Sequence, residues 1–113
     1  MSAVSQAVFT PLPHDPECTL LTPALDVADP ELSIVIPAMN ERLTIGDTIK
    51  WCQEGFRKAN VVGEVLIIDS SSDETPQIAL EHGARVLKTP RRGLGRAYID
   101  AIPYIRANYI LMG

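Results

Sequence analysis

Arginine and glycine alternate in a short segment that could hold an anionic group. The segment, PRRGLGRA at residues 90–97, contains no acidic residue. Glycine lets a ligand approach the backbone closely, and the forked guanidinium group of arginine matches the oxygens of a phosphate. A helix expected behind the segment adds the positive end of its dipole. The segment therefore predicts a bound diphosphate, with the candidate residues Arg91, Arg92, Gly93, Gly95 and Arg96.

Other phosphate-binding motifs do not fit this segment. A dinucleotide fingerprint would need glycine at Tyr98 and should follow the first strand, and no GxxxxGK[ST] motif occurs. Half of the ten basic residues fall between Arg85 and Arg96 in a chain of net charge −4. This concentration of charge suggests an anionic ligand, but a solvated strand end and loop would explain it equally well.

A carboxylate lies at the end of a second apolar run. Asp69 closes the run at residues 64–68, where its oxygens could accept hydrogen bonds from a nucleobase or a ribose. Ser71 belongs to the polar loop that follows and is a further candidate ligand-binding residue. Asp73, in the same loop, is expected to cap the next helix, because short polar side chains bind free backbone N–H groups there.

The first apolar run ends in a loop of similar character. Pro37 fixes the direction in which the chain leaves residues 32–36, and Ala38, Asn40 and Glu41 follow. The side chains of Asn40 and Glu41 could bind a ligand, or they could serve the N-terminus of the next helix, where acidic groups are favoured. The residues alone leave both explanations open.

Alternating elements must position these loops. Apolar runs and helical spacing predict strands at 32–36, 64–68, 84–88 and 108–112 and helices at 44–58, 76–82 and 96–107. Pro103 is expected to kink or end the last helix. The alternation predicts an α/β fold, a Rossmann-like parallel sheet covered on both faces, with the strand order 3-2-1-4. Because such sheets bind ligands beyond the carboxyl ends of their strands, the polar loops should meet at one edge.

Composition narrows the class of protein. The 113 residues suffice for one small domain, and the net charge of −4 argues against a nucleic-acid partner. We expect neither a membrane span nor a secretory signal. Residues 1–31 form a proline-rich, acidic tail, expected either to be flexible or to lie over the domain, and no chemistry is assigned to it. Cys18 and Cys52 are expected to be free thiols rather than one disulfide.

Four segments together resemble one family of enzymes. LSIVIPAMNE is similar to the first strand and turn of family 2 glycosyltransferases, and EVLIIDSSSDET to their second strand and loop. GARVLKTPRRGLGRA resembles their third strand and arginine-glycine turn, and NYILMG the strand before their D-x-D metal motif. The resemblance covers residues 32–113 and is nearest to the polyprenyl- and dolichol-phosphate sugar synthases. It departs from the family in the second loop, which is one residue short and has serines in place of glycine.

The resemblance implies an activity and a role for the candidate residues. It implies a GT-A fold and transfer of a sugar from a UDP- or GDP-sugar donor to a lipid phosphate or to another acceptor such as a saccharide. Residues 32–113 would be the nucleotide-sugar-binding half of the domain. Within it, the loop at residues 37–41 would contact the nucleoside, Asp69 the base or ribose, and the turn at residues 91–96 the diphosphate.

The same resemblance implies that catalysis needs further residues. A divalent cation, Mn²⁺ or Mg²⁺, would be held by D-x-D carboxylates after Gly113, so no catalytic residue and no metal ligand is assigned here. Residues 1–113 alone are therefore expected to be inactive. The enzyme is expected in the cytoplasm, with attachment to the inner face of the membrane as an option. Two alternatives stay open: a non-catalytic nucleotide-binding module, and an unrelated doubly wound domain that interacts with proteins.

Overall fold

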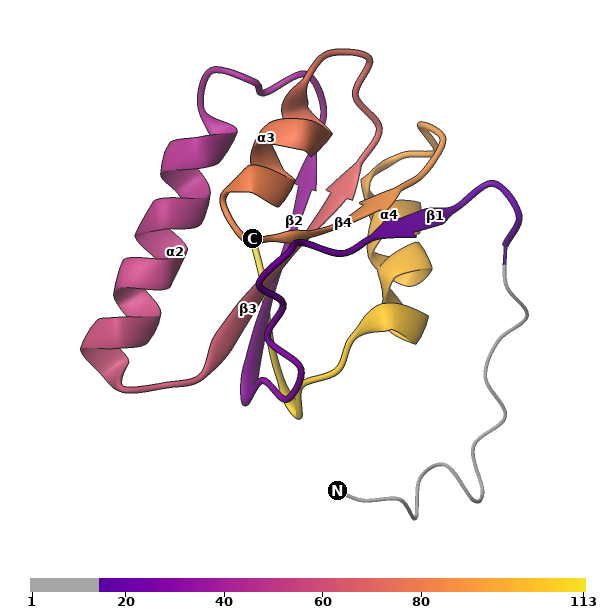
Figure 1. Cartoon of the computed structure of the whole chain (residues 1–113). Helices are drawn as coiled ribbons and strands as arrows, with labels where there is room; N and C mark the ends of the chain where they lie inside the picture. The colour runs from indigo at the N-terminus through magenta and orange to yellow at the C-terminus, as the bar shows by residue number, and fades with distance from the viewer. Residues whose placement is uncertain (1–14) are drawn as a thin grey trace, which may run out of the picture.

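One sheet forms the centre of the molecule, in a computed structural model that describes residues 15–113 (Figure 1). Its strands are β1 (Thr19–Leu21), β2 (Leu32–Ala38), β3 (Gly63–Asp69), β4 (Arg85–Lys88) and β5 (Tyr109–Met112). They lie in the order β1-β4-β3-β2-β5. Strands β2 to β5 run parallel to one another, whereas β1 is antiparallel to β4.

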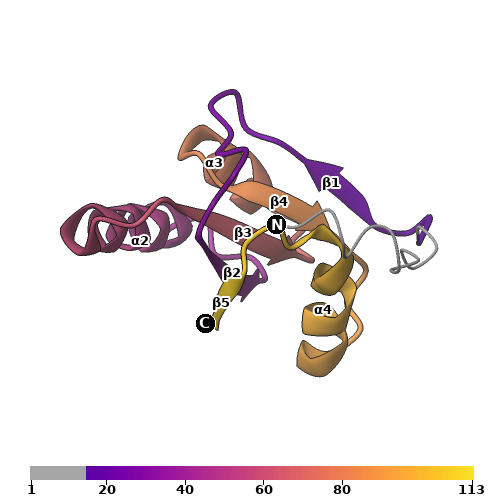
Figure 2. The ribbon, with the colours of Figure 1, turned by 90° about the horizontal axis from the view of Figure 1, so that it is seen from below.

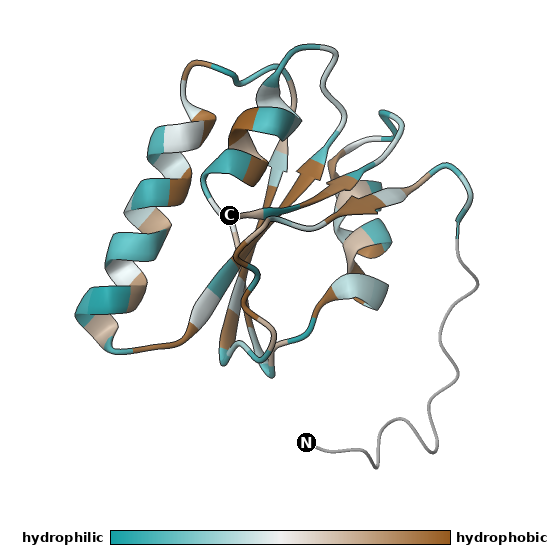
Figure 3. Cartoon of the chain, viewed as in Figure 1, coloured by the Kyte–Doolittle hydropathy of each residue, from teal (hydrophilic) through white to brown (hydrophobic). Residues whose placement is uncertain are grey.

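Helices cover both faces of this sheet. Those in the described part of the chain are α2 (Ile45–Ala59), α3 (Thr75–Glu81) and α4 (Leu94–Ala101), with a short 3-10 helix, η1 (Ile102–Tyr104), after α4. Helices α2 and α3 pack on one face and α4 packs on the other (Figure 2). Helix α2 turns Ile45, Ile49 and Phe56 toward the core and a polar face toward solvent (Figure 3).

Burial on both faces explains why the strands read as continuous apolar runs. In β3, every residue from Glu64 to Asp69 is buried. Val65 and Ile67 belong to the core under α2 and α3, whereas Leu66 and Ile68 belong to the core under α4. Because helices cover both faces of the strand, neither face carries a row of polar side chains.

The predicted fold class is confirmed, and the four predicted strands lie in the predicted order. The order 3-2-1-4 corresponds to β4-β3-β2-β5. Strand β1 is an addition that the sequence pattern does not indicate, with Thr19 paired to Lys88 and Leu21 to Val86. Within the N-terminal segment, residues 19–21 thus join the edge of the sheet. Residues 1–14 are outside the described part of the chain.

The last helix is shorter than the predicted range of residues 96–107. Helix α4 ends at Ala101, and η1 takes its place around Pro103. Proline has no backbone N–H and its ring clashes with the preceding turn, which accounts for the early end that its position predicts. None of the helices in residues 15–113 has the length and hydrophobicity needed to cross a bilayer.

A buried ion-pair network fastens the amino ends of the parallel strands. Glu64 accepts two hydrogen bonds from Arg85 (2.8 and 3.0 Å), one from Arg106 (2.7 Å) and one from Ser33 (2.7 Å). Arg106 also forms two hydrogen bonds of 2.8 Å with Asp26. Burial by itself would raise the pKa of Glu64, but the hydrogen bonds from Arg85, Arg106 and Ser33 outweigh it and lower that pKa. Arg85, which the sequence groups with the other arginines of an anion-binding segment, therefore serves the fold.

Candidate functional site

The register of the parallel strands brings three loops to one edge of the sheet. Ala38, the last residue of β2, pairs with Asp69, the last residue of β3, and Asp69 pairs with Lys88, the last residue of β4. The chain thus leaves all three strands at the same level (Figure 1). Because parallel sheets bind ligands at this carboxyl edge, the loops after β2, β3 and β4 form the candidate site.

Hydrogen bonds tie the first two loops into one unit. The backbone N–H of Asn40 donates to Ser71 Oγ (2.7 Å), and Asn40 Oδ1 accepts a hydrogen bond from the backbone N–H of Ser72 (2.9 Å). Asn40 has φ 54°, a left-handed conformation that asparagine tolerates. The backbone N–H of Glu41 donates to Thr75 Oγ1 (2.9 Å). Asn40 and Ser71 therefore fix how the two loops lie relative to each other.

A cavity of about 330 Å³ opens between the loops after β2 and β4. This volume is in the range of small-molecule sites. Five of the residues predicted from the sequence line it, namely Pro37, Ala38, Arg91, Arg92 and Gly93. Gly93 has φ 94°, which a residue with a side chain rarely adopts.

The remaining predicted residues do not line the cavity. Asn40, Glu41 and Ser71 lie in the two connected loops, and Glu41 Oε2 accepts a long hydrogen bond from the backbone N–H of Met39 (3.3 Å). Gly95 and Arg96 lie in the first turn of α4, and Asp69 lies at the end of β3.

Asp69 is buried beside the cavity with one oxygen unsatisfied. The residues on either side of it, Ile68 and Ser70, line the cavity, and Asp69 itself is 1% exposed. Its Oδ2 accepts a hydrogen bond from the backbone N–H of Ser71 (3.2 Å), whereas Oδ1 has no hydrogen-bond partner within the described residues. A buried acceptor without a donor costs about 1–3 kcal/mol. Asp69 Oδ1 thus lacks the hydrogen bond that an N–H or O–H group of a ligand would supply.

Arg92 lines the cavity and lies close to three carboxylates. Its Nη1 is 2.8 Å from Asp15 Oδ2 and 3.8 Å from Asp100 Oδ1, and its Nη2 is 3.1 Å from Glu17 Oε1. The hydrogen bond from Arg92 lowers the pKa of Asp15. Arg96 Nε is 3.0 Å from Asp100 Oδ1, and Arg96 Nη2 is 3.8 Å from Asp15 Oδ2. We call these five residues the arginine–carboxylate cluster.

Sequence reasoning missed the acidic half of this cluster. The pairing of Asp15 with Arg92 spans 77 positions and leaves no local pattern. Asp100 had a readable signal, since it stands four residues after Arg96 on one helix, a spacing that brings side chains together. Arg91, by contrast, forms no ion pair within residues 15–113 and is exposed at the cavity.

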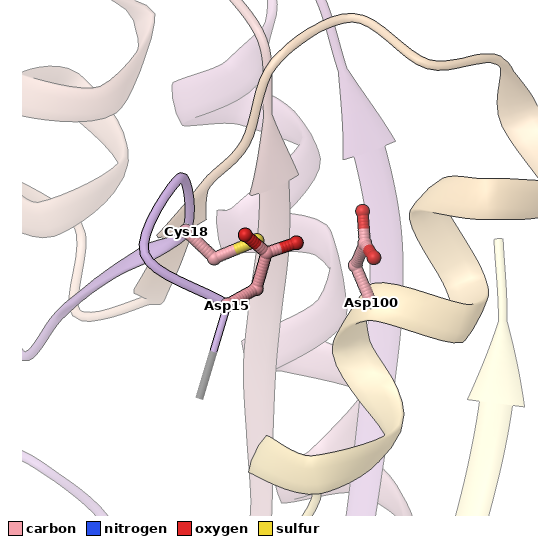
Figure 4. A group of neighbouring side chains, drawn as sticks. All are labelled: Asp15, Cys18 and Asp100. Carbon is pink, nitrogen blue, oxygen red and sulfur yellow. The ribbon is translucent and has the colours of Figure 1, made fainter. Parts of the chain in front are cut away.

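Asp15, Cys18 and Asp100 bring three potential metal ligands together (Figure 4). One ligand atom of each lies within 4.8 Å of the other two. The set does not fit the Mn²⁺ or Mg²⁺ that the family resemblance implies, because these ions prefer oxygen ligands and both carboxylates already pair with Arg92 and Arg96. Cys18, like the second cysteine of the chain, is a free thiol, and burial followed by the nearby Asp100 and Asp15 raises its pKa. We therefore assign no metal to this group.

Comparison with known sequences identifies relatives of this arrangement. The family model for Glycosyl transferase family 2 matches residues 33–112. The chain is also 40% identical over 100 residues to the low-salt glycan biosynthesis hexosyltransferase Agl6 of Haloferax volcanii. That match covers 88% of this chain and 24% of the relative.

Two solved structures share the fold. A mannosyl-3-phosphoglycerate synthase from Rubrobacter xylanophilus aligns with a TM-score of 0.65 at 26% identity, over 72% of this chain and 29% of the other. A glucosyl-3-phosphoglycerate synthase from Mycobacterium tuberculosis, in complex with phosphoglyceric acid, aligns with a TM-score of 0.59 at 26% identity, over 78% and 36%. The chain thus spans between 24% and 36% of the length of these three relatives. They support the predicted GT-A-type fold without singling out the polyprenyl-phosphate branch. The chain belongs to glycosyl transferase family 2.

Proposed function

We propose that this chain binds the nucleoside diphosphate of a UDP- or GDP-sugar for a family 2 glycosyltransferase. The observation that carries the proposal is Asp69, a buried carboxylate with an unpartnered oxygen beside a cavity whose opposite loop carries Arg91 and Arg92. A nucleoside diphosphate has N–H and O–H groups at one end and negative charge at the other. An acceptor buried next to the cavity and a pair of cations that line it match that order of groups.

Each predicted residue then has a role in the proposed site. Pro37 and Ala38 pack against the nucleoside, and Asp69 accepts a hydrogen bond from the base or the ribose. The turn after β4 holds the diphosphate through side chains and backbone groups of Arg91, Arg92, Gly93, Gly95 and Arg96. Asn40, Glu41 and Ser71 keep the first two loops in the shape that the ligand meets.

In the proposed reaction, the bond between the sugar and the diphosphate breaks as the acceptor oxygen attacks. Negative charge collects on the departing diphosphate, and cationic side chains already in place stabilise it without reorganisation. A divalent cation would supply further neutralisation when bound. The acceptor is a lipid phosphate or a saccharide by resemblance, and the names of the two solved relatives favour 3-phosphoglycerate as an alternative. A cytoplasmic location, with or without attachment to the membrane, belongs to the same proposal.

Titration of the protein with UDP and GDP, followed by calorimetry, tests the site. The variant Asp69→Ala should bind its nucleotide at least about tenfold more weakly, because a hydrogen bond to a charged acceptor contributes about 1.5–3 kcal/mol. The matched control is Asp73→Ala. Asp73 accepts a hydrogen bond from the backbone N–H of Thr75 at the start of α3 (2.9 Å). Its loss should lower the melting temperature by a few degrees and leave nucleotide affinity unchanged.

Three results would count against the proposal in different ways. Equal affinity of wild type and Asp69→Ala would remove Asp69 from the site. Absence of nucleotide binding by the wild type would favour the alternative that the chain is a doubly wound domain that interacts with proteins. Binding without transfer of a radiolabelled sugar, by the whole protein supplied with Mn²⁺ or Mg²⁺, would favour the non-catalytic nucleotide-binding module.

A further inference from the structure

Two kinds of partner compete for the terminal nitrogens of Arg92: carboxylates of the N-terminal segment and the proposed diphosphate. Arg92 lines the cavity, and its two terminal nitrogens already bind carboxylates of the N-terminal segment, Nη1 with Asp15 and Nη2 with Glu17. A phosphate that binds an arginine with two parallel hydrogen bonds uses one edge of the guanidinium fork. Each terminal nitrogen of Arg92 therefore already donates a hydrogen bond to a carboxylate before any diphosphate binds.

The charges of the region support competition. Arg91, Arg92 and Arg96 bring three positive charges to the turn after β4, and Asp15, Glu17 and Asp100 bring three negative charges to the same place. In this state the region has no net charge with which to attract a diphosphate. Once Asp15 and Glu17 turn away, a net charge of about +2 remains, opposite in sign to the ligand and similar in size.

The two kinds of carboxylate in the cluster differ in how firmly they are held. The Asp100 side chain is 7% exposed and belongs to α4, so it stays beside Arg92 and Arg96. The Glu17 side chain is 68% exposed, and that of Asp15 is partly exposed. Water and salt weaken ion pairs of such exposed side chains, so these two pairs exchange readily. Both residues precede Thr19, where β1 begins, so rotation of their side chains would not require β1 to leave β4.

We propose that Asp15 and Glu17 are a built-in competitor for the diphosphate, an autoinhibitory contact that masks Arg92 in the free protein. This inference rests on the proposed function, since it takes the cavity at Arg92 as the diphosphate site. Donor binding then replaces two carboxylates by two phosphate groups on the same arginine. The N-terminal segment sets the affinity of the site without touching the nucleoside.

The test measures binding of inorganic pyrophosphate, UDP and GDP by calorimetry at low salt. The variant Asp15→Asn/Glu17→Gln should bind each ligand that the wild type binds about fivefold more tightly, because two exposed ion pairs no longer compete. The control Asp29→Asn/Glu81→Gln removes the same charge from two exposed carboxylates outside the cluster. It should stay within about twofold of wild type. Melting curves of all variants confirm that the fold is kept.

A double-mutant cycle with Arg92→Gln separates competition from a general charge effect. If Asp15 and Glu17 act through Arg92, their substitution should give no gain in affinity in the Arg92→Gln background. Unchanged or weaker binding by Asp15→Asn/Glu17→Gln, or an equal gain from the control, would overturn the inference and leave the proposed function standing. Binding of pyrophosphate without UDP or GDP would instead overturn the proposed function, and the pyrophosphate affinities would still decide whether the carboxylates compete.

Discussion

Two groups of arginine and carboxylate side chains lie at opposite ends of the same strands. At the amino end, Glu64 is 4% exposed, and both of its oxygens accept hydrogen bonds from arginine. At the carboxyl edge, Arg92 pairs with partly exposed carboxylates beside a cavity, and Asp100 Oδ2 is buried without a hydrogen-bond partner in the described residues. The residue types are the same, so completeness of hydrogen bonding and access to a cavity are what distinguish a structural group from a candidate site.

The largest expected effect is on stability. It concerns the buried network around Glu64, Arg85 and Arg106, which we call the amino-end network. The variant Glu64→Gln should lose about 3–5 kcal/mol in the free energy of unfolding, because it leaves Arg85 and Arg106 without their buried counter-charge. Urea denaturation followed by circular dichroism measures the loss.

Glu74 provides the matched control for that substitution. It forms an exposed ion pair with Arg42 at 3.2 Å. The variant Glu74→Gln should change the free energy of unfolding by less than about 1 kcal/mol. Similar losses for the two variants would show that burial does not separate the two kinds of ion pair in this protein.

The second effect concerns binding at the other end of the sheet. Arg92→Gln should weaken UDP or GDP binding about tenfold, since it removes charge-assisted hydrogen bonds to the diphosphate. Its melting temperature should stay near that of the wild type, because Asp15 and Glu17 are partly or largely exposed and the buried Asp100 keeps its ion pair with Arg96. Arg85→Gln, measured in parallel, should lower the melting temperature and leave the affinity for UDP or GDP near that of the wild type. Loss of stability in Arg92→Gln as large as in Arg85→Gln would contradict the distinction between the two groups.

The smallest effect is the pH dependence of stability that Glu64 contributes. The pKa of Glu64 is lower in the folded protein than its ordinary value of 4.5. Its contribution to stability is therefore present above about pH 4.5 and is lost as the pH falls through the lower folded pKa. Urea midpoints of wild type and Glu64→Gln, measured from about pH 6 down to about pH 3, should converge in acid. A gap that stays constant over this range would mean that Glu64 does not titrate with unfolding.

Local patterns were enough to predict the parallel sheet and most of its loops. The runs around Val65 and Ile67 are apolar because helices cover both faces, and the chemistry of proline predicts the early end at Pro103. Asp69 could be placed at the edge of the sheet because it directly follows a buried run. These features depend on residues close together in the chain, which is why periodicity and spacing reveal them.

Long-range pairing could not be predicted in the same way. Nothing near Thr19 indicates a strand of three residues, since β1 exists only because β4 offers it an edge. The same holds for Arg85, whose charge looked like part of an anion-binding segment until Glu64, 21 positions away, was found against it. Charge counted along a sequence does not show which charges are already neutralised by the fold.

Strand β1 also gives the chain an order of assembly. It is synthesised before every other described strand, yet Thr19 cannot pair until Lys88 has been made. Strands β2 and β3 are joined by α2 alone and can close much earlier, because short connections cost less entropy than long ones. During synthesis, the segment that carries Asp15 and Glu17 therefore stays without its partner while the first strands pair. It can contact Arg92 only when the turn after β4 has left the ribosome. Among the described strands, the first to be made is therefore one of the last to be paired.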